Sequence, residues 1–230
     1  MEAIVLAGGF GTRLREVVPD IPKPMAPIAG RPFLEILLSS LAQKGFKRVL
    51  LSLGFMAEKV VAHFGDQFAG MELVYQIEKV PLGTGGAVRQ ALAHCCNDHA
   101  FVFNGDTYLD LDVLEVEAHW QAHHAPIIVA RWVSDTSRYG RLSVAEERVL
   151  GFMEKNVGGP GLINAGCYVL PVSILDGFAV GHPFSLETDF LAKEVRLQRF
   201  DLFVTQGQFI DIGIPVDYMR AQTELAEISH

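Results

Sequence analysis

Residues 3–9, Ala3-Ile4-Val5-Leu6-Ala7-Gly8-Gly9, are an apolar run that ends in two glycines. A short run without polar residues is typical of a strand that is buried on both faces of a parallel sheet. The next segment, residues 32–45, begins at a proline, carries apolar residues at helical spacing and ends at a glycine, which predicts a helix. A strand followed by a helix is the unit of an α/β fold, in which ligands bind at the carboxyl ends of the strands.

The same alternation continues through the first half of the chain. The pattern predicts strands at Val49–Leu53, Leu73–Ile77 and Ala100–Phe103 and helices at Met56–Phe64 and Thr84–Cys95. The second half has strand-like runs with short links, which favours an antiparallel portion: Pro126–Val133, Arg141–Val144, Val149–Glu154 and Asn164–Leu170. Further helices are expected near Leu186–Leu197 and from Pro215 to about Ile228. No linker or repeat divides the chain, so we expect one compact domain over residues 1–230.

The composition excludes several classes of protein. The chain has 230 residues, 50% of them hydrophobic, and a formal net charge of −8. An acidic chain without a run of basic residues is a poor nucleic-acid surface, and no stretch reaches the ~18 apolar residues that span a bilayer. The N-terminus lacks the basic region of a secretory signal, and the three cysteines, which have no metal-binding spacing, are expected to be small buried hydrophobes. We therefore expect a cytoplasmic protein that binds neither nucleic acid nor membrane.

A glycine-rich loop and a lysine follow the first strand. Gly8, Gly9 and Gly11 let the backbone approach a ligand closely and point N–H groups at it. Arg13 offers a forked donor that suits phosphate oxygens, and Lys23 lies between two prolines that restrict its backbone. The spacing fits neither the P-loop nor the dinucleotide-binding fingerprint. A tight turn with solvated cations is one explanation, but the local surplus of positive charge in an acidic chain favours a site for a polyphosphate.

These motifs resemble those of a known family. The sequence Gly8-Gly9-Phe10-Gly11-Thr12-Arg13-Leu14, followed by Pro22-Lys23-Pro24, resembles the signature of the sugar-1-phosphate nucleotidyltransferases. Members join a nucleoside triphosphate to a sugar 1-phosphate and release pyrophosphate. The resemblance implies a single-domain Rossmann-like nucleotidyltransferase fold of the α/β class, with a mixed, mainly parallel sheet flanked by helices. Because the sequence ends after the helix expected from Pro215, we expect no C-terminal β-helix of the kind found in some relatives. It also implies that Arg13 and Lys23 are catalytic, and that the nucleotide is held by Leu6, Ala7, Gly8, Gly9, Gly11 and Thr12.

Two aspartates follow apolar runs later in the chain. Asp106 comes after the strand expected at Ala100–Phe103, and Asp211 ends the run Phe209-Ile210-Asp211. Carboxylates at two strand ends can hold one Mg²⁺, which prefers oxygen ligands and substrate phosphates, although the residues alone fit capping or turn positions better. Both positions match the metal-binding pair of the family, so the resemblance implies Mg²⁺ as a cofactor bound by Asp106 and Asp211.

A second glycine-rich turn, Leu82–Ala87, follows Glu78. In the family this region holds the nucleobase, so the resemblance implies nucleotide-binding roles for Glu78, Gly83, Thr84 and Gly85. A carboxylate only accepts hydrogen bonds, and guanine offers N1–H and N2–H₂ together, whereas uracil and thymine flank one N–H with oxygens that a carboxylate repels. Glu78 therefore favours guanine, and a solvated glutamate is the alternative.

The sugar phosphate is expected to bind residues from the second half of the chain. Phe152-Met153-Glu154-Lys155 resembles the sugar-site pair of the family, which implies that Lys155 binds the phosphate and Glu154 a sugar hydroxyl. Asn164 and the pair Tyr139-Gly140 match further sugar contacts of the family. An exposed strand pair is the alternative for Glu154 and Lys155, and a turn residue is the alternative for Asn164.

Glu78 and the segment Phe184–Leu191 are most similar to the family members that make GDP-heptose for bacterial surface glycans, the D-glycero-α-D-manno-heptose 1-phosphate guanylyltransferases. We therefore expect a Mg²⁺-dependent guanylyltransferase whose partners are GTP and a sugar 1-phosphate, with a homodimer left open. A uridylyl- or thymidylyltransferase is the first alternative, and a non-catalytic sugar-nucleotide sensor is another. A metal-dependent glycosyltransferase could use Asp110 and Asp112, but these residues are better explained as the start of a helix at Val113.

Two histidines form a further pattern. His119 and His123 lie one helical turn apart, a spacing that can bind a transition metal. We expect no acidic third ligand and no catalytic glutamate to accompany them. A solvated helix face is therefore the preferred interpretation.

Overall fold

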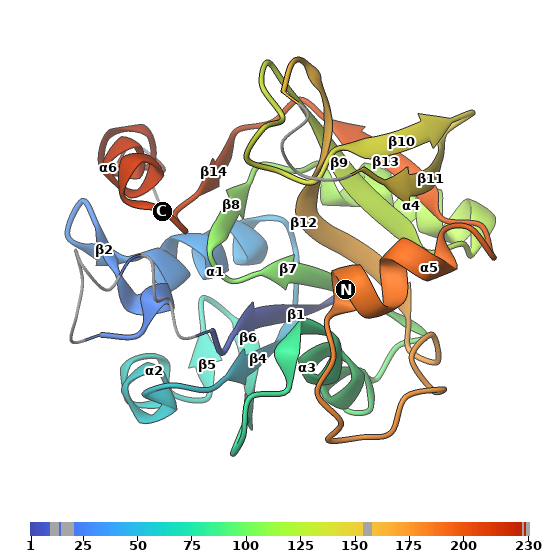
Figure 1. The fold of residues 1–230 in the computed structure, drawn as a ribbon. Coiled ribbons are helices and arrows are strands. Elements are labelled where there is room, and N and C mark those ends of the chain that lie inside the picture. The colour runs from blue at the N-terminus through green and yellow to red at the C-terminus, as the bar shows by residue number, and fades with distance from the viewer. Residues whose placement is uncertain (10–13, 15–20, 154–157, 227, 229–230) are drawn as a thin grey trace. The chain divides into compact units, whose positions relative to one another are not determined.

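The computed structural model describes residues 1–9, 14, 21–153, 158–226 and 228 (Figure 1). The chain contains both helices and strands, and its residues group into two compact units. The first unit comprises residues 1–81, 103–108 and 210–230, and the second comprises residues 82–102 and 109–209. The single domain expected over residues 1–230 stays a prediction.

Parallel strands form the sheet of the first unit. β1 (Glu2–Ala7) pairs with β4 (Arg48–Leu53), and β4 pairs with β6 (Met71–Ile77), so that the three strands end side by side (Figure 1). β5 (Gln67–Phe68) pairs antiparallel with β6. The connecting helices are α1 (Phe33–Gln43) and α2 (Ala57–Phe64). The parallel strands and the helices expected in this part of the chain are confirmed, and three carboxyl ends meet at one edge of the sheet.

An apolar cluster in the first unit gathers segments that are far apart in the sequence. α6 (Pro215–Glu224) packs there with the chain around η1 (Lys23–Met25), β2 (Pro27–Ile28) and β3 (Arg31–Pro32). The Tyr218 hydroxyl donates to the Pro27 carbonyl at 2.7 Å. Fully burying one large apolar side chain contributes roughly 1.5–3 kcal/mol. The cluster therefore holds in place the neighbouring segments that carry the predicted lysine and aspartates.

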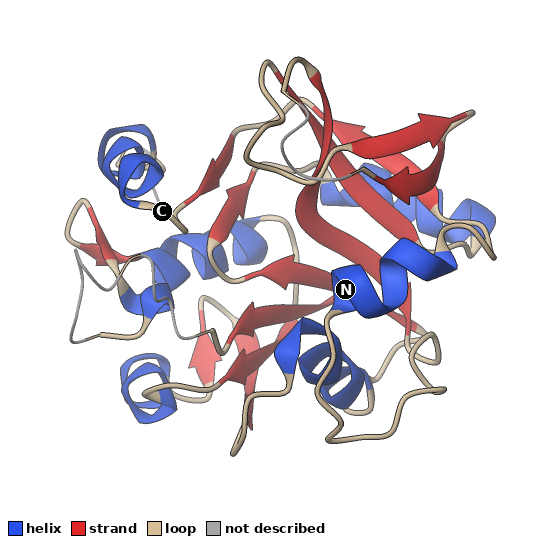
Figure 2. Cartoon of the chain, in the orientation of Figure 1, coloured by secondary structure: helices blue, strands red, loops and turns tan. Residues whose placement is uncertain are grey.

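Antiparallel pairs are frequent in the second unit. β9 (Ile127–Val133) pairs antiparallel with β12 (Gly161–Pro171) and parallel with β13 (Asp201–Thr205), and β10 (Leu142–Ala145) pairs antiparallel with β11 (Arg148–Phe152). Figure 2 shows the accompanying helices, which are α3 (Gly83–Leu92), α4 (Val113–His123), η2 (Leu186–Leu191) and α5 (Ala192–Glu194). The remaining strands are β7 (His99–Asn104), β8 (Thr107–Leu109) and β14 (Phe209–Asp211). The α/β class and the antiparallel portion are confirmed.

The structure corrects several details. α3 ends at Leu92 and not at Cys95, because the N–H groups of His94 and Cys95 bond to carbonyls three residues back and the chain turns. The helix expected near Leu186–Leu197 begins as a π-helix and continues as the short α5, and α6 ends at Glu224.

Cys167 is buried, which raises the pKa of its thiol. Cys96 is exposed, so the expectation of three buried cysteines is wrong, because Cys96 lies beyond the end of α3.

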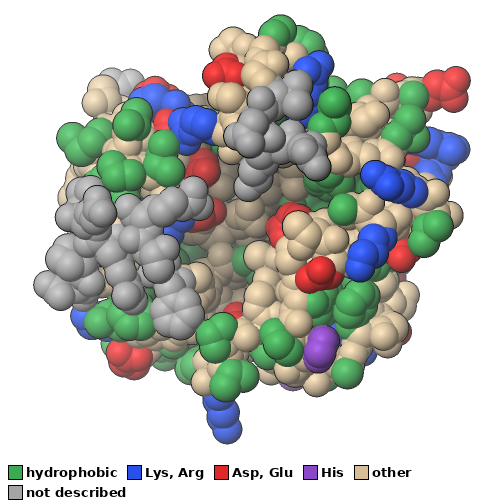
Figure 3. Space-filling model, viewed as in Figure 1, with side chains coloured by type: hydrophobic (Ala, Val, Ile, Leu, Met, Phe, Trp, Pro, Cys, Tyr) green, Lys and Arg blue, Asp and Glu red, His purple; other side chains and the backbone are tan. Residues whose placement is uncertain are grey.

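Two further observations concern the surface. Among the described residues, no helix has the length and apolar character needed to cross a membrane. On the face drawn in Figure 3, lysine and arginine side chains occur at separate places among acidic and apolar ones. The charge of that face is therefore mixed.

Candidate active site

Close backbone contacts fix the end of β1. The Gly105 N–H donates to the Leu6 carbonyl at 2.9 Å, and a Cβ on Gly105 would lie 2.5 Å from that oxygen and 3.1 Å from Ala7 Cα. Only glycine therefore lets the chain lie this close to β1. Asp106 is thereby held beside the carboxyl end of β1, where the loop at Gly8 begins.

Glu78 lies against the start of this loop. A Cβ on Gly8 would come within 2.8 Å of Glu78 Oε1 and 3.3 Å of the Gly54 nitrogen, so a larger residue at position 8 would displace the carboxylate. Ser52 Oγ donates to Glu78 Oε1 at 3.0 Å, and Gln76 Nε2 donates to Ser52 Oγ at 3.4 Å. The half-buried Glu78 is thus oriented by its neighbours. The structure brings together two residues that belong to separate motifs of the sequence, and it adds Ser52, which no sequence motif indicates.

Lys23 is held at the opening of η1. Pro22 precedes it with a φ of −65°, and the Ala26 N–H donates to the Lys23 carbonyl at 3.0 Å. The Lys23 ammonium pairs with Asp106 Oδ2. The side chain of Lys23 is only 12% exposed, and that of Asp106 is 35% exposed. A lysine this deeply placed needs a carboxylate partner, because burying an unpaired charge is costly.

Asp211 belongs to the same cluster. The Gly213 N–H donates to Asp211 Oδ1 at 2.7 Å, and a Cβ on Gly213 would lie 2.6 Å from that oxygen and 3.1 Å from Lys23 Nζ. Burial raises the pKa of Asp211, and the negative charge of Asp106 raises it further, while the Gly213 N–H and Lys23 act in the opposite direction. Two carboxylates therefore share one ammonium group.

The chemistry of this donor set fits a divalent cation. Carboxylate oxygens are ligands that Mg²⁺ prefers, and it binds through one or two of them together with substrate phosphates. The pKa of Asp211 is raised because Lys23 alone does not offset burial and the charge of Asp106. An additional positive charge at this place would stabilise both carboxylates in their ionised form.

Phe184 packs so closely against the second glycine-rich turn that Gly83 and Gly85 have no room for a side chain. A Cβ on Gly83 would lie 2.5 Å from the Phe184 carbonyl oxygen, and a Cβ on Gly85 would lie 2.2 Å from the Phe184 ring. The φ of +67° at Gly83 also favours glycine. The Gly85 N–H donates to the Phe184 carbonyl at 3.0 Å, and the Phe184 ring stacks on Phe178. Packing within the second unit explains these glycines, and their nucleotide-binding role stays a prediction.

Thr84 is engaged by the same segment. Its Oγ1 donates to Glu187 Oε2 at 2.7 Å and accepts from the Leu186 N–H at 2.9 Å. Glu187 also accepts from Ser185 Oγ at 3.1 Å. The carboxylate of Glu187 therefore ties the start of η2 to the glycine-rich turn. No individual role for Glu187 follows from the sequence, because its partner Thr84 lies 103 residues away.

Asn164 lies at an irregularity in β12, where the register against β9 shifts. Its Nδ2 donates to the Tyr168 hydroxyl at 2.7 Å, and its Oδ1 accepts from a backbone N–H two residues on at 3.1 Å. Burial raises the pKa of Tyr168, and the Glu187 carboxylate raises it further. The Asn164 N–H donates to the Gly140 carbonyl at 3.4 Å. The structure thus brings Asn164 together with the pair Tyr139-Gly140, as the shared sugar-binding prediction requires.

Some of the predicted site residues lie outside the described residues, namely Gly11, Thr12, Arg13, Glu154 and Lys155. Gly9 lies within the described residues and is exposed.

Asp112 Oδ1 accepts from the N–H groups of Leu114 and Glu115, each at 3.1 Å. This hydrogen bonding confirms that Asp112 begins a helix, and it explains the residue without a glycosyltransferase metal site.

Comparisons with known proteins agree over nearly the whole chain. A family model described as Nucleotidyl transferase matches residues 2–228. The chain is 39% identical over 226 residues to the D-glycero-alpha-D-manno-heptose 1-phosphate guanylyltransferase of Aneurinibacillus thermoaerophilus, with 98% of each chain covered. It is 40% identical over 220 residues to the Campylobacter jejuni protein of the same name, with 95% and 97% covered. The crystal structure of HddC from Yersinia pseudotuberculosis complexed with GMP-PN matches with a TM-score of 0.85 at 38% identity, covering 96% of this chain and 97% of that one.

Proposed function

Because the chain belongs to the nucleotidyl transferase family, we propose that it transfers a guanylyl group from GTP to a sugar 1-phosphate, with D-glycero-α-D-manno-heptose 1-phosphate as the acceptor. An oxygen of the sugar phosphate bonds to the α-phosphorus of GTP, and the bond to the β-phosphate breaks. The products are a GDP-sugar and pyrophosphate. The observation that carries the proposal is the identity of 39% to a guanylyltransferase of this name over 98% of both chains.

Positioning and charge neutralisation account for the catalysis. The attacking sugar phosphate oxygen is already an anion, so the reaction needs no general base. In this proposal Lys23 binds the α-phosphate, and Arg13 and the loop from Leu6 to Thr12 hold the triphosphate. A preorganised cation at a reacting phosphate lowers the barrier because it meets the charge of the transition state without reorganisation. The pairing of Lys23 with Asp106 and its place between two prolines supply that preorganisation.

We assign Asp106 and Asp211 as the residues that hold Mg²⁺. When bound, the ion neutralises phosphate oxygens and helps to orient the triphosphate. The raised pKa of Asp211 supports the assignment, since its causes are burial and the negative charge of the neighbouring Asp106. The Gly213 N–H keeps Asp211 Oδ1 in a fixed position.

Glu78 is proposed to select guanine. Its carboxylate accepts from N1–H and N2–H₂ of the base, and the hydrogen bond from Ser52 Oγ orients it. The description of the Yersinia structure as a complex with GMP-PN supports a guanine nucleotide over the uridylyl and thymidylyl alternatives. Gly83, Thr84 and Gly85 are proposed to contact the nucleotide through the backbone of their turn.

The sugar phosphate is assigned to residues from the second half of the chain. We propose that Lys155 binds its phosphate, that Glu154 and Asn164 contact sugar hydroxyls, and that the pair Tyr139-Gly140 makes a backbone contact nearby. The hydrogen bond that Asn164 Nδ2 donates to the Tyr168 hydroxyl at 2.7 Å supports this role, because it orients the amide. The product would serve surface polysaccharide synthesis and would be made in the cytoplasm, where GTP is available.

Light scattering would distinguish a monomer from the homodimer left open by the sequence.

A matrix of substrates tests the proposal. GTP, UTP, dTTP and CTP are each combined with a panel of sugar 1-phosphates, and pyrophosphate release is measured. We expect the highest kcat/KM for GTP with D-glycero-α-D-manno-heptose 1-phosphate. A preference for UTP or dTTP would overturn the guanylyl assignment, and a preference for another sugar phosphate would overturn the heptose. If no combination released pyrophosphate, nucleotidyl transfer itself would be overturned.

A further inference from the structure

The two histidines on α4 have a third neighbour that the sequence does not reveal. His119 Nε2 lies 2.9 Å from Asp201 Oδ2, and His123 Nδ1 lies 3.4 Å from the same oxygen. Asp201 is the first residue of β13 and is 82 positions away from His119 in the sequence. The expectation that no acidic residue accompanies the histidines is therefore wrong. All three ligand-type atoms lie within 4.8 Å of one another.

The carboxylate of Asp201 is buried, ionised and held from one side. Its side chain is 1% exposed, whereas His119 is 20% and His123 41% exposed. Arg199 pairs with Asp201 Oδ1, and its Nη2 lies 3.1 Å from Oδ2. Burial acts to raise the pKa of Asp201, but hydrogen bonds from Arg199 and His119 hold it below its usual value. Arg199 thus takes the position of the hydrogen-bond donor that commonly orients a metal-binding carboxylate. Asp201 Oδ2 faces the imidazoles of His119 and His123.

The geometry and the ligand types match a zinc-type ion. Two imidazole nitrogens and one carboxylate oxygen are ligands of Zn²⁺, with bonds of about 2.0–2.2 Å. Atoms at this distance from one tetrahedral ion are ~3.3 Å apart. The observed separations of 2.9 Å and 3.4 Å from Asp201 Oδ2 bracket that value. The third pair, the two imidazole nitrogens, lies within 4.8 Å, so rotation of the histidine side chains would have to bring these nitrogens to the same separation round one ion.

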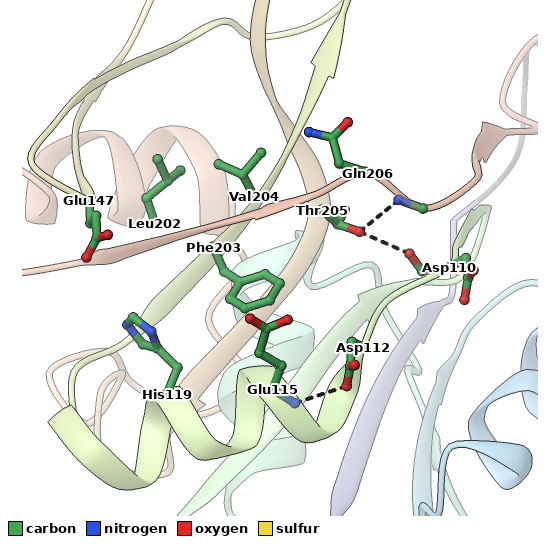
Figure 4. A pocket seen from close by; sticks show the side chains of 11 residues that line it. Asp110, Asp112, Glu115, His119, Glu147, Leu202, Phe203, Val204, Thr205 and Gln206 are labelled. Atoms are coloured by element: carbon green, nitrogen blue, oxygen red, sulfur yellow. Dashed lines mark hydrogen bonds between the residues drawn. The ribbon is translucent and has the colours of Figure 1, made fainter.

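An acidic cleft leads to His119. The cleft measures about 650 Å³, and its lining includes His119, Glu115, Glu147, Asp110 and Asp112. Figure 4 shows Glu115 one turn before His119 on α4 and Glu147 on the other side of the imidazole. A cleft lined by one sign of charge raises the local concentration of counter-ions. It provides a route for a cation to one of the three ligands.

We propose that His119, His123 and Asp201 bind a transition-metal dication of the zinc type, which ties α4 to β13 within the second unit. The ion is distinct from the proposed Mg²⁺, because imidazole nitrogen favours zinc, cobalt, nickel and copper, whereas Mg²⁺ favours oxygen ligands. The proposed nucleotidyl transfer assigns no role to these three residues. The site therefore does not depend on the proposed function.

Metal titration of the full chain tests this site. The protein is prepared without a polyhistidine tag, stripped with a chelator and titrated with Co²⁺ in excess Mg²⁺, followed by displacement with Zn²⁺. We expect one equivalent of Co²⁺, with visible absorption bands of a nitrogen- and oxygen-ligated ion and no thiolate charge-transfer band. His119→Gln and His123→Gln should each weaken binding about 10-fold or more. Zn²⁺ should raise the Tm of the wild type and much less that of either variant.

His63→Gln is the matched control. His63 lies on α2 in the first unit, is 43% exposed and has one carboxylate, Glu35, at 3.6 Å. This variant should bind Co²⁺ like the wild type. No binding by the wild type, or equal binding by the wild type, His119→Gln and His123→Gln, would overturn the proposal. A thiolate band that disappears in Cys96→Ser would also overturn it, because it would place the ion on the exposed cysteine.

Discussion

Replacement of Glu78 by glutamine tests whether this side chain selects the nucleobase. In the wild type, Ser52 Oγ donates to Glu78 Oε1 at 3.0 Å. Glutamine keeps the shape and one acceptor oxygen, but it places a donor NH₂ group at the second position. When the amide oxygen keeps the bond from Ser52, the NH₂ group takes the place of Oε2. Guanine then loses one charge-assisted hydrogen bond.

The expected magnitude follows from that single bond. A hydrogen bond to a charged group contributes roughly 1.5–3 kcal/mol, and each ~1.4 kcal/mol is a factor of ten. The kcat/KM for GTP should therefore fall about 10- to 150-fold in Glu78→Gln. The relative use of UTP and dTTP should rise, because the new donor can face a carbonyl of a pyrimidine.

The assay measures kcat/KM for GTP, UTP and dTTP at one fixed sugar phosphate. Ser52→Ala is the matched control, since it removes the hydrogen bond that orients Glu78 and keeps the carboxylate. A neutral hydrogen bond contributes about 1 kcal/mol, so this variant should lose about 5-fold in kcat/KM and still prefer GTP. An unchanged ratio of GTP to UTP use in Glu78→Gln would refute the reasoning and assign base selection to the backbone of residues 82–86.

The remaining predictions concern the charged cluster and the packing of the second turn. Lys23→Ala should lower kcat about 100-fold or more, because losing a preorganised charge at the reacting phosphate costs about 3 kcal/mol; near-normal turnover of the folded variant would remove Lys23 from the mechanism. Asp106→Ala and Asp211→Ala should each suppress Mg²⁺-dependent turnover, with the double variant no worse than either single one in a sensitive pyrophosphate assay; multiplying defects would contradict a shared ion. Without Mg²⁺, Asp211→Asn should raise the Tm at neutral pH, because the raised pKa of Asp211 means that its ionised form costs stability above that pKa. This gain should shrink in melts at lower pH, as Asp211 takes up a proton, and a gain independent of pH would argue against the charge as its cause. Gly85→Ala should lower the Tm, because its Cβ would lie 2.2 Å from the Phe184 ring and overpacking costs roughly 1–3 kcal/mol; an unchanged Tm would show that Phe184 can move aside.

Local patterns in the sequence were sufficient for the elements that carry the charged cluster. The apolar run before Gly8 predicts a strand, and β1 lies there. The prolines around Lys23 indicate a restricted backbone, and Pro22 precedes η1 with a φ of −65°. Asp106 and Asp211 needed the family resemblance, because an aspartate after a strand has the same local pattern in an ordinary turn. The ion pair of Lys23 with Asp106 spans 83 residues and became visible only in the structure.

Interactions between distant residues explain what the sequence did not indicate. β13 is five residues long and begins with a buried charge, Asp201, so its apolar run of three residues is too short to predict a strand. Its charge is stabilised by Arg199 and by His119, which comes from another part of the chain. Glu187 likewise has its partner Thr84 in a different segment. Periodicity reports which face of an element is buried, and it carries no information about such partners.

The central claim is that an oxygen of the sugar 1-phosphate displaces pyrophosphate from the α-phosphorus of GTP. Phosphorus NMR of the wild-type enzyme with GTP, Mg²⁺ and D-glycero-α-D-manno-heptose 1-phosphate follows all substrates and products in one sample. We expect GDP-heptose and pyrophosphate to appear in equal amounts, and neither to form when the sugar phosphate is omitted. Release of GDP and inorganic phosphate in place of these products, or turnover with UTP and not with GTP, would contradict the claim.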